Sequence, residues 1–167
     1  MNQVNEVAPP EGSLIADQSL LDGYYTDCFT VDWDGEVSLS DFITAFYKTP
    51  LFRLERLVLG VTPKGRMCDA DVDALASGEC EAMSMWRVEA RREAEILLSA
   101  GRTKSWLMVT PYEGGTRLFF GSVVVPEPAK RAGQTPRLGP VFDSLMGAHK
   151  VYSRLLLGSA SQRLQRA

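Results

Sequence analysis

The stretch LGPVFDSLMGAHKVYSRLLL, residues Leu138–Leu157, decides the expected fold of this chain. Pro140 suits the first turn of a helix, where its missing N–H costs no hydrogen bond. Apolar and aromatic residues follow at spacings of three and four, so they share one helix face. They are Phe142, Leu145, His149, Tyr152 and Leu156. About 18 helical residues span about 27 Å. Gly158 with Ser159 predicts the end of the helix, although Leu164 could carry a frayed extension. A helix this long and apolar must pack lengthwise on a large surface, and only the strand-rich half of the chain offers one.

Five strands are predicted in that half. The first covers residues 24–33, where the set containing Tyr25, Phe29 and Val31 alternates with more polar residues. Four more are predicted at residues 85–91, 93–100, 103–110 and 117–125. Two glycines in the turn at residues 112–115 predict a hairpin, because glycine adopts positive φ freely. Connections this short make the last four strands an antiparallel meander.

Short helices fill the interval between the first strand and the meander. Ser38 predicts an N-cap, with Asp41 three residues later in a capping-box position. Thr49 and the proline after it predict the start of a second helix, which runs to about residue 59. A third short helix is predicted from an Asp69 cap to Gly78.

This order of elements predicts a single α+β domain of the helix-grip type. In that fold a curved antiparallel sheet wraps around a long C-terminal helix, and a cavity lies between them. A ferredoxin-like sandwich requires a helix between its middle strands, and four consecutive strands leave no room for it. We expect residues 1–22 to be a loose N-terminal arm, residues 23–158 the helix-grip domain, and residues 159–167 a C-terminal tail.

The last two predicted strands, residues 103–110 and 117–125, carry apolar side chains on both faces. A strand with one solvated face would instead alternate apolar and polar residues. The long helix covers only one of these faces. The other needs a second cover, either from the pair of short helices, which in this fold sit at one end of the sheet, or from another subunit. This pattern predicts a homodimer whose interface includes Leu107, Val109, Phe119 and Val123.

Composition is that of a soluble globular chain. A length of 167 residues fits one domain with a sizeable core. No apolar run approaches the length of a membrane span, and the N-terminus lacks the basic and apolar regions of a secretory signal. Three widely spaced cysteines, Cys28, Cys68 and Cys80, argue against a disulfide framework or a zinc site. We therefore expect reduced thiols in a cytoplasmic protein.

Charge is unevenly distributed along the chain. Before Lys48 there are nine Asp and Glu and no Lys or Arg, whereas from Lys130 onward seven Lys and Arg stand against Asp143 alone. Either the two ends are neighbours whose fields offset each other, or the C-terminal part forms a basic surface for an anionic partner. The overall acidic balance and the absence of a basic–aromatic stripe favour the first interpretation and predict no nucleic-acid partner.

A resemblance supports the same fold. Residues 49–59 (TPLFRLERLVL), 101–109 (GRTKSWLMV), 114–126 (GGTRLFFGSVVVP) and the stretch 138–157 resemble an uncharacterised bacterial family similar to DUF2867, within the START/Bet v 1-like (SRPBCC, polyketide cyclase-like) superfamily. The resemblance covers most of residues 24–158 by order of elements. It implies a helix-grip fold and binding of apolar small molecules, and it implies no particular reaction. The chain departs from it in having five clear strands where full members have more.

His149 is the only histidine and falls on the apolar face of the long helix. It can act as a general acid or base near neutral pH, although such a histidine more often makes a structural hydrogen bond. Catalysis would require a partner supplied by the fold, such as Asp27, Glu89 or Tyr152.

The expected ligand site lies between the sheet and the long helix, because ligand pockets are mostly apolar with a few polar groups. Its predicted lining residues are Trp86, Val88, Trp106, Phe120, Leu145, His149 and Tyr152. No catalytic, phosphate-binding or metal-binding motif is present in the sequence, so no cofactor is expected. The predicted function is binding of an apolar small molecule or lipid. The alternatives are a cyclase- or dehydratase-type enzyme using His149, and a non-catalytic homodimeric assembly protein with a filled cavity.

Overall fold

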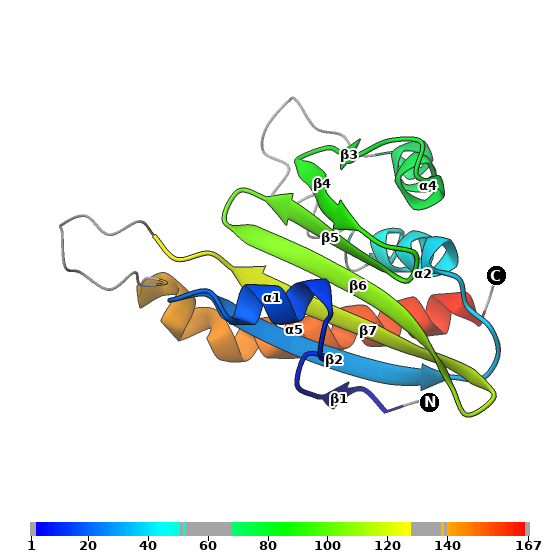
Figure 1. The fold of residues 1–167 in the computed structure, drawn as a ribbon, viewed down its shortest axis with the longest axis horizontal. Coiled ribbons are helices and arrows are strands. Elements are labelled where there is room, and N and C mark those ends of the chain that lie inside the picture. Colours follow the sequence, from blue (N-terminus) through cyan, green and yellow to red (C-terminus); the bar gives the residue numbers. More distant parts are fainter. Residues whose placement is uncertain (1–2, 51, 53–67, 128–137, 139, 166–167) are drawn as a thin grey trace.

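A seven-stranded antiparallel sheet with the order β1-β2-β7-β6-β5-β4-β3 forms the body of the protein (Figure 1). The structure is a computed structural model that describes residues 3–50, 52, 68–127, 138 and 140–165, with the backbone alone for residues 140–146. The strands are β1 (Asn5–Glu6), β2 (Tyr25–Trp33), β3 (Ala82–Met83), β4 (Trp86–Arg91), β5 (Glu95–Ala100), β6 (Thr103–Tyr112) and β7 (Gly115–Val124). The five strands expected from the sequence are all present. The two additional strands, β1 and β3, are too short to give a periodic signal.

Helices cover both faces of the sheet. They are α1 (Leu14–Ser19), α2 (Leu39–Tyr47), α4 (Asp69–Ser77) and α5 (Pro140–Leu164). Helix α5 runs along β2 and β7, with α2 beside it on the same face and α4 next to α2 (Figure 1). We call this face the inner face and the opposite one, which carries α1, the outer face. An antiparallel sheet with a long C-terminal helix along it is the predicted α+β helix-grip fold, and that prediction is confirmed.

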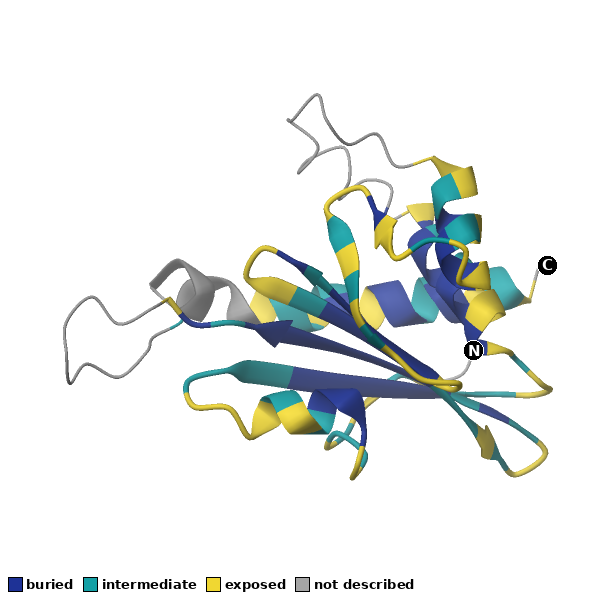
Figure 2. Cartoon of the chain, turned by 45° about the horizontal axis from the view of Figure 1, so that its top comes forward, coloured by how far each residue is buried: buried dark blue, intermediate teal, exposed yellow. Residues whose placement is uncertain are grey.

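The main core lies between the inner face and helices α2, α4 and α5 (Figure 2). Phe46 of α2 packs on Phe120 of β7 with ring centroids 4.7 Å apart. Leu156 and Leu157 of α5 and Phe29 of β2 join the same cluster, and all three are almost fully buried. Burial of so many large side chains at about 25 cal/mol per Å² of apolar surface holds the helices to the sheet.

The N-terminal segment differs from the expected loose arm. Residues 14–19 form α1, whose Leu14 and Ile15 are buried in a second core on the outer face. The buried Glu95 carboxylate accepts hydrogen bonds from the Leu14 amide at 2.9 Å and from the Trp106 indole at 2.7 Å. The arm is therefore anchored by a polar contact 81 residues distant in sequence, which local composition cannot reveal.

The predicted sheet-face dimer interface is wrong because its residues do not share a face. Leu107 and Val109 belong to the inner core, whereas Phe119 and Val123 pack under α1 on the outer face. Leu107, Phe119 and Val123 are buried within the single chain. The second cover that the doubly apolar strands require is α1, so these strands do not call for a partner chain.

Helix ends follow the local signals closely. Ser38 accepts from the Asp41 amide at 3.1 Å, and the two residues form the predicted capping box. Gly78 ends α4 with a φ of +82°, as a left-handed C-cap requires. The N-cap of α4 is Cys68, one residue before the predicted Asp69, because the Asp71 carboxylate accepts a hydrogen bond from the Cys68 amide.

Helix α5 passes through the expected stop at Gly158 and ends at Leu164, as the alternative of an extension to Leu164 had it. Leu157 and Ala160 on either side of the glycine are fully buried, so tertiary packing overrides the cost of about 1 kcal/mol that glycine carries in a helix. None of the described helices combines the length and apolar character needed to cross a lipid bilayer.

Two sequence predictions fall outside what the structure describes. The second tandem helix, predicted at residues 49–59, falls mostly on residues that the structure does not describe, although the Thr49 hydroxyl does accept a hydrogen bond from the Phe52 amide at 3.2 Å as a cap would. The side chain of Leu145 belongs to the backbone-only part of α5. Both remain predictions.

Candidate functional site

A row of buried polar residues crosses the apolar inner face. Asp27 on β2 is the Cα partner of Ser122 on β7, and Ser122 is the partner of Ser105 on β6. All three are buried. Ser105 also shares a hydrogen bond of 2.8 Å with the hydroxyl of Tyr47 on α2. Buried polar groups require partners, and this row satisfies them largely from neighbouring strands.

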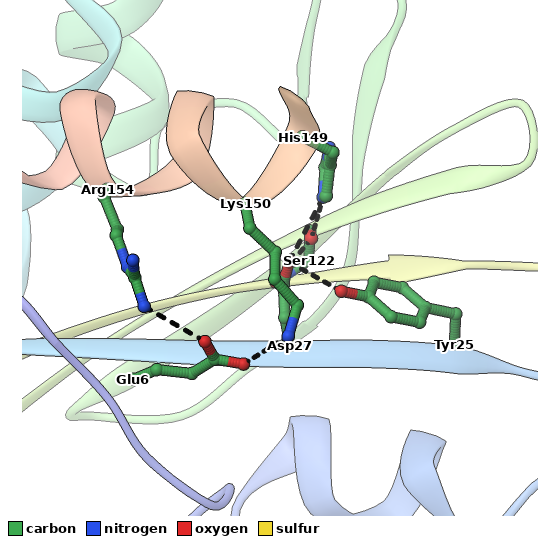
Figure 3. Close-up of polar contacts among 7 residues, drawn as sticks. All are labelled: Glu6, Tyr25, Asp27, Ser122, His149, Lys150 and Arg154. Atoms are coloured by element: carbon green, nitrogen blue, oxygen red, sulfur yellow. Dashed lines mark hydrogen bonds and ion pairs between the residues drawn. The ribbon is translucent and has the colours of Figure 1, made fainter. Parts of the chain in front are cut away.

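At the β2 end of the row, Asp27 gathers contacts from Ser122, Tyr25 and His149 (Figure 3). Its carboxylate accepts from the Ser122 amide at 2.9 Å and from the Ser122 hydroxyl at 2.6 Å. The Tyr25 hydroxyl lies 3.4 Å from its second oxygen. The Asp27 side chain is only 1% exposed, so these donors replace the water that a buried carboxylate has lost.

His149 of α5 lies directly over this carboxylate (Figure 3). Its Nε2 is 2.7 Å from the Ser122 hydroxyl oxygen and 3.2 Å from Oδ2 of Asp27. The single hydroxyl proton of Ser122 goes to Asp27, so the serine oxygen accepts at the histidine. His149 Nε2 therefore carries a proton that it shares between Ser122 and Asp27. This contact fixes the middle of α5 to the sheet.

Asp27, Ser122 and His149 are the residue types of a hydrolase catalytic triad, but their hydrogen bonds are not arranged as in a triad. A triad serine donates to Nε2 of the histidine, and the aspartate holds the opposite ring nitrogen. Here Asp27 and Ser122 meet the same nitrogen, and the serine proton points to the aspartate. Ser122 is consequently not activated as a nucleophile.

Two neighbouring groups are held in their neutral forms. Burial, then the adjacent Asp27 charge, raises the pKa of the Tyr25 phenol well above its ordinary value. The phenol therefore stays protonated as a donor. Burial and the same carboxylate raise the pKa of the Cys28 thiol to about 12, so Cys28 is a packed thiol of the outer core and not a nucleophile.

A second set of contacts ties α5 to the sheet edge. Glu6 of β1 binds Lys150 at 2.6 Å and Arg154 at 3.2 Å (Figure 3). Such exposed pairs contribute about 0–1 kcal/mol each. They join the acidic N-terminal part of the chain to its basic C-terminal part, as the first interpretation of the charge distribution predicted.

The structure brings together only part of the predicted ligand-site residues. Phe120 lies in the inner core, and Trp86, Val88 and Tyr152 pack against that core while partly exposed. Trp106 is fully buried on the outer face under α1, so the prediction that it shares a site with the others is wrong.

The predicted role of Asp27 as a partner for His149 agrees with the geometry, whereas Ser122 and Tyr25 were missed as members of the cluster. A signal for Asp27 existed in the sequence, because a carboxylate on the apolar side of the first strand needs a buried partner. Nothing local marks Ser122, since its place opposite Asp27 depends on the β2–β7 register. Among the described residues no group of three or more His, Cys, Asp or Glu is placed to hold a metal ion.

An open groove of about 690 Å³ lies elsewhere, between the N-terminal segment and the outward side of α5. Its lining residues are Gln3, Val4, Arg154, Leu155, Gly158, Ser159, Ser161, Gln162 and Gln165. None of the predicted ligand-site residues lines this groove.

Comparison with solved structures gives a weak structural likeness. No protein-family model and no curated protein matches the chain. A solved structure described as the crystal structure of Ara h 8.0201 aligns with 87% of this chain and 100% of its own, at 10% identity and a TM-score of 0.40. A match of this identity and TM-score carries no inference about ligand, reaction or partner.

Proposed function

We propose that this protein binds an apolar small molecule or lipid carrying one polar group, in the layer between the inner face and α5, and performs no catalysis of its own. The observation that carries the proposal is the row Asp27–Ser122–Ser105 within an otherwise apolar inner face. Ligand sites combine a large apolar lining with a few polar groups that fix orientation. A protein that needs only a filled core gains nothing from such a row, because an apolar core of the same volume avoids the desolvation of a carboxylate.

Ser153 on α5 adds a second observation. It lies four residues after His149, hence on the same helix side, and is fully buried. Its hydroxyl has no hydrogen-bond partner among the described residues. An unpaired buried hydroxyl costs about 1–3 kcal/mol, and a polar group on a ligand would remove that cost.

Native mass spectrometry of the purified protein tests the proposal. We expect a co-purified small molecule in a defined ratio to the chain. The dye 1-anilinonaphthalene-8-sulfonate serves as a second probe, titrated into the protein and followed by NMR. The indole N–H resonance of Trp86 should shift saturably with dye concentration, while that of Trp106 on the outer face should not move. Ser153→Ala should weaken binding, and its free protein should be at least as stable as wild type. No bound mass together with no saturable shift at Trp86 would overturn the proposal.

A second candidate, an acid–base enzyme of the cyclase or dehydratase kind, is favoured by the 3.2 Å contact between His149 and Asp27. A carboxylate beside an imidazole can orient the ring and stabilise its protonated form, and a positioned histidine is the commonest general acid or base. His149→Gln separates the two functions. If the protein is a binder, wild type and His149→Gln should carry the same small molecule. If it is an enzyme, the His149→Gln variant should retain the substrate, whose mass differs from that of the product found with wild type.

The third candidate is a homodimeric assembly protein with a filled core, and it no longer has the interface predicted from the sequence. Kinship with DUF2867 relatives, a bacterial source and a cytoplasmic location stay predictions. Measuring subunit number in the same native spectra addresses the homodimer.

A further inference from the structure

The outer face of the sheet has a gap in its row of side chains. Cys28 on β2, Gly121 on β7 and Trp106 on β6 are successive Cα partners across the three strands. Gly121 carries no side chain, so it leaves a socket between the Cys28 thiol and the Trp106 indole. Ile15 of α1 fills that socket, because a Cβ placed on Gly121 would collide with Ile15 Cδ1 and lie 3.2 Å from the Trp106 ring. Ile15 is completely buried as a result.

The segment that carries Ile15 is short and lies between two glycines. Helix α1 has six residues, whereas isolated helices shorter than about 12–15 residues are marginal in water. Gly12 precedes the segment and Gly23 follows it, each with a φ of +75°. Glycine changes backbone conformation at little cost, and a few loop residues of this kind are enough to act as a hinge. We call residues 13–22 the flap.

Two hydrogen bonds from strand side chains hold the flap to the outer face. The Glu95 carboxylate accepts from the Leu14 amide at 2.9 Å, and the Lys104 ammonium donates to Oε1 of Gln18 at 2.8 Å. Arg92 also pairs with Glu95 at 2.9 Å. The carboxylate therefore keeps a charged partner when the Leu14 amide leaves, and departure of the flap does not strand a buried charge.

We infer that the flap opens about its two hinge glycines while the rest of the protein stays folded, and that it then uncovers an apolar surface around Cys28 and Trp106. The strands beneath the flap pair with one another, so the sheet does not need it. The inner core is a separate cluster on the other side of that sheet (Figure 1). Opening loses the burial of Leu14 and Ile15 alone, and such local openings cost less than global unfolding. The uncovered surface goes beyond ligand binding in the inner layer, because the sheet separates the two.

Alkylation of Cys28 by iodoacetamide tests the opening. The reagent attacks a thiolate, and the closed protein protects Cys28 because the thiol is buried and its pKa is raised to about 12. Mass spectrometry of the Cys28 peptide separates its labelling from that of Cys68 and Cys80. In wild type the labelling rate should be nearly independent of urea below the unfolding transition, because opening of the flap exposes little surface. A rate that rises steeply from the lowest urea concentrations, in step with global unfolding, overturns the inference.

Two truncations separate opening of the flap from global unfolding. Ile15→Ala empties the socket, so Cys28 should be labelled at least about 30-fold faster, the factor that corresponds to the low end of the cost of truncating a buried isoleucine. Leu157→Ala is the matched control, because Leu157 is equally buried but lies in the inner core. It lowers global stability and should change Cys28 labelling by less than about threefold, as expected for independent sites.

An unchanged labelling rate in Ile15→Ala, or an equal acceleration by Leu157→Ala, overturns the inference. The urea dependence of the wild type decides the question by itself if either variant fails to fold.

Discussion

Asp27 offers the sharpest test of how α5 is held to the sheet. Asp27→Ala leaves the Ser122 amide, the Ser122 hydroxyl and the His149 Nε2 proton without their shared acceptor. Ser122 and His149 can still bond to each other, but the strand amide cannot move. Removing one partner of a buried polar or ionic contact costs about 3–5 kcal/mol, and we expect a loss in that range in the free energy of unfolding.

Asp27→Asn separates charge from shape. The amide oxygen can keep both Ser122 hydrogen bonds, whereas its NH₂ group would face the His149 proton. We expect a smaller loss of about 1–2 kcal/mol, typical of a single weakened buried contact. A double-mutant cycle with His149→Gln should return a coupling energy of about 0.5–3 kcal/mol, as for residues in one hydrogen-bond network.

Urea unfolding at pH 7, followed by circular dichroism and tryptophan fluorescence, measures these losses. Coincident curves from the two probes justify two-state analysis. Asp32→Asn is the matched control on the same strand, because the Asp32 side chain is 45% exposed and its pair with Arg117 lies at the surface; it should cost at most about 1 kcal/mol. An Asp27→Ala loss no larger than that of the control, or a coupling of zero within error, would refute the reasoning.

Three further perturbations probe the fold. Gly147→Ala in α5 should raise the free energy of unfolding by about 0.5–1 kcal/mol, because nothing lies within 4 Å of the added Cβ; unchanged or lower stability in thermal melts would contradict it. Gly121→Ala should cost several kcal/mol and release α1, since its Cβ would meet Ile15 and lie 2.6 Å from the Asp27 carbonyl oxygen, and faster amide exchange in residues 14–19 would report the release. The Cys28 thiol has a pKa raised from 9.0 to about 12, so the unfolded chain ionises it at lower pH than the folded chain; its contribution to stability is full below pH 9 and is lost between pH 9 and 12. Cys28→Ala should flatten that part of the stability–pH curve in urea titrations, and an unchanged slope would contradict the shift.

Local signals in the sequence determined the elements and most of their ends. The capping box at Ser38, the glycine stop at Gly78 and the turn at residues 112–115 each depend on neighbours within a few positions, so they are legible without the fold. The order of these elements was enough to predict the helix-grip fold, because few topologies accommodate a four-strand meander followed by a long helix. The α5 helix was also predicted from a local signal, the three–four spacing of its apolar residues.

Only the tertiary structure decided which faces are covered and which polar groups meet. A strand alternates its side chains with a period of two, so sequence shows that two sets exist but not which helix covers each one. Leu107 and Phe119 were therefore grouped wrongly, and α1 was mistaken for a loose arm because Glu95 anchors it from 81 residues away. The Asp27–Ser122–His149 contact depends on the register of β2 with β7 and on where α5 crosses them. Such long-range pairing is set by the packing of the whole core, and no local pattern in the chain encodes it.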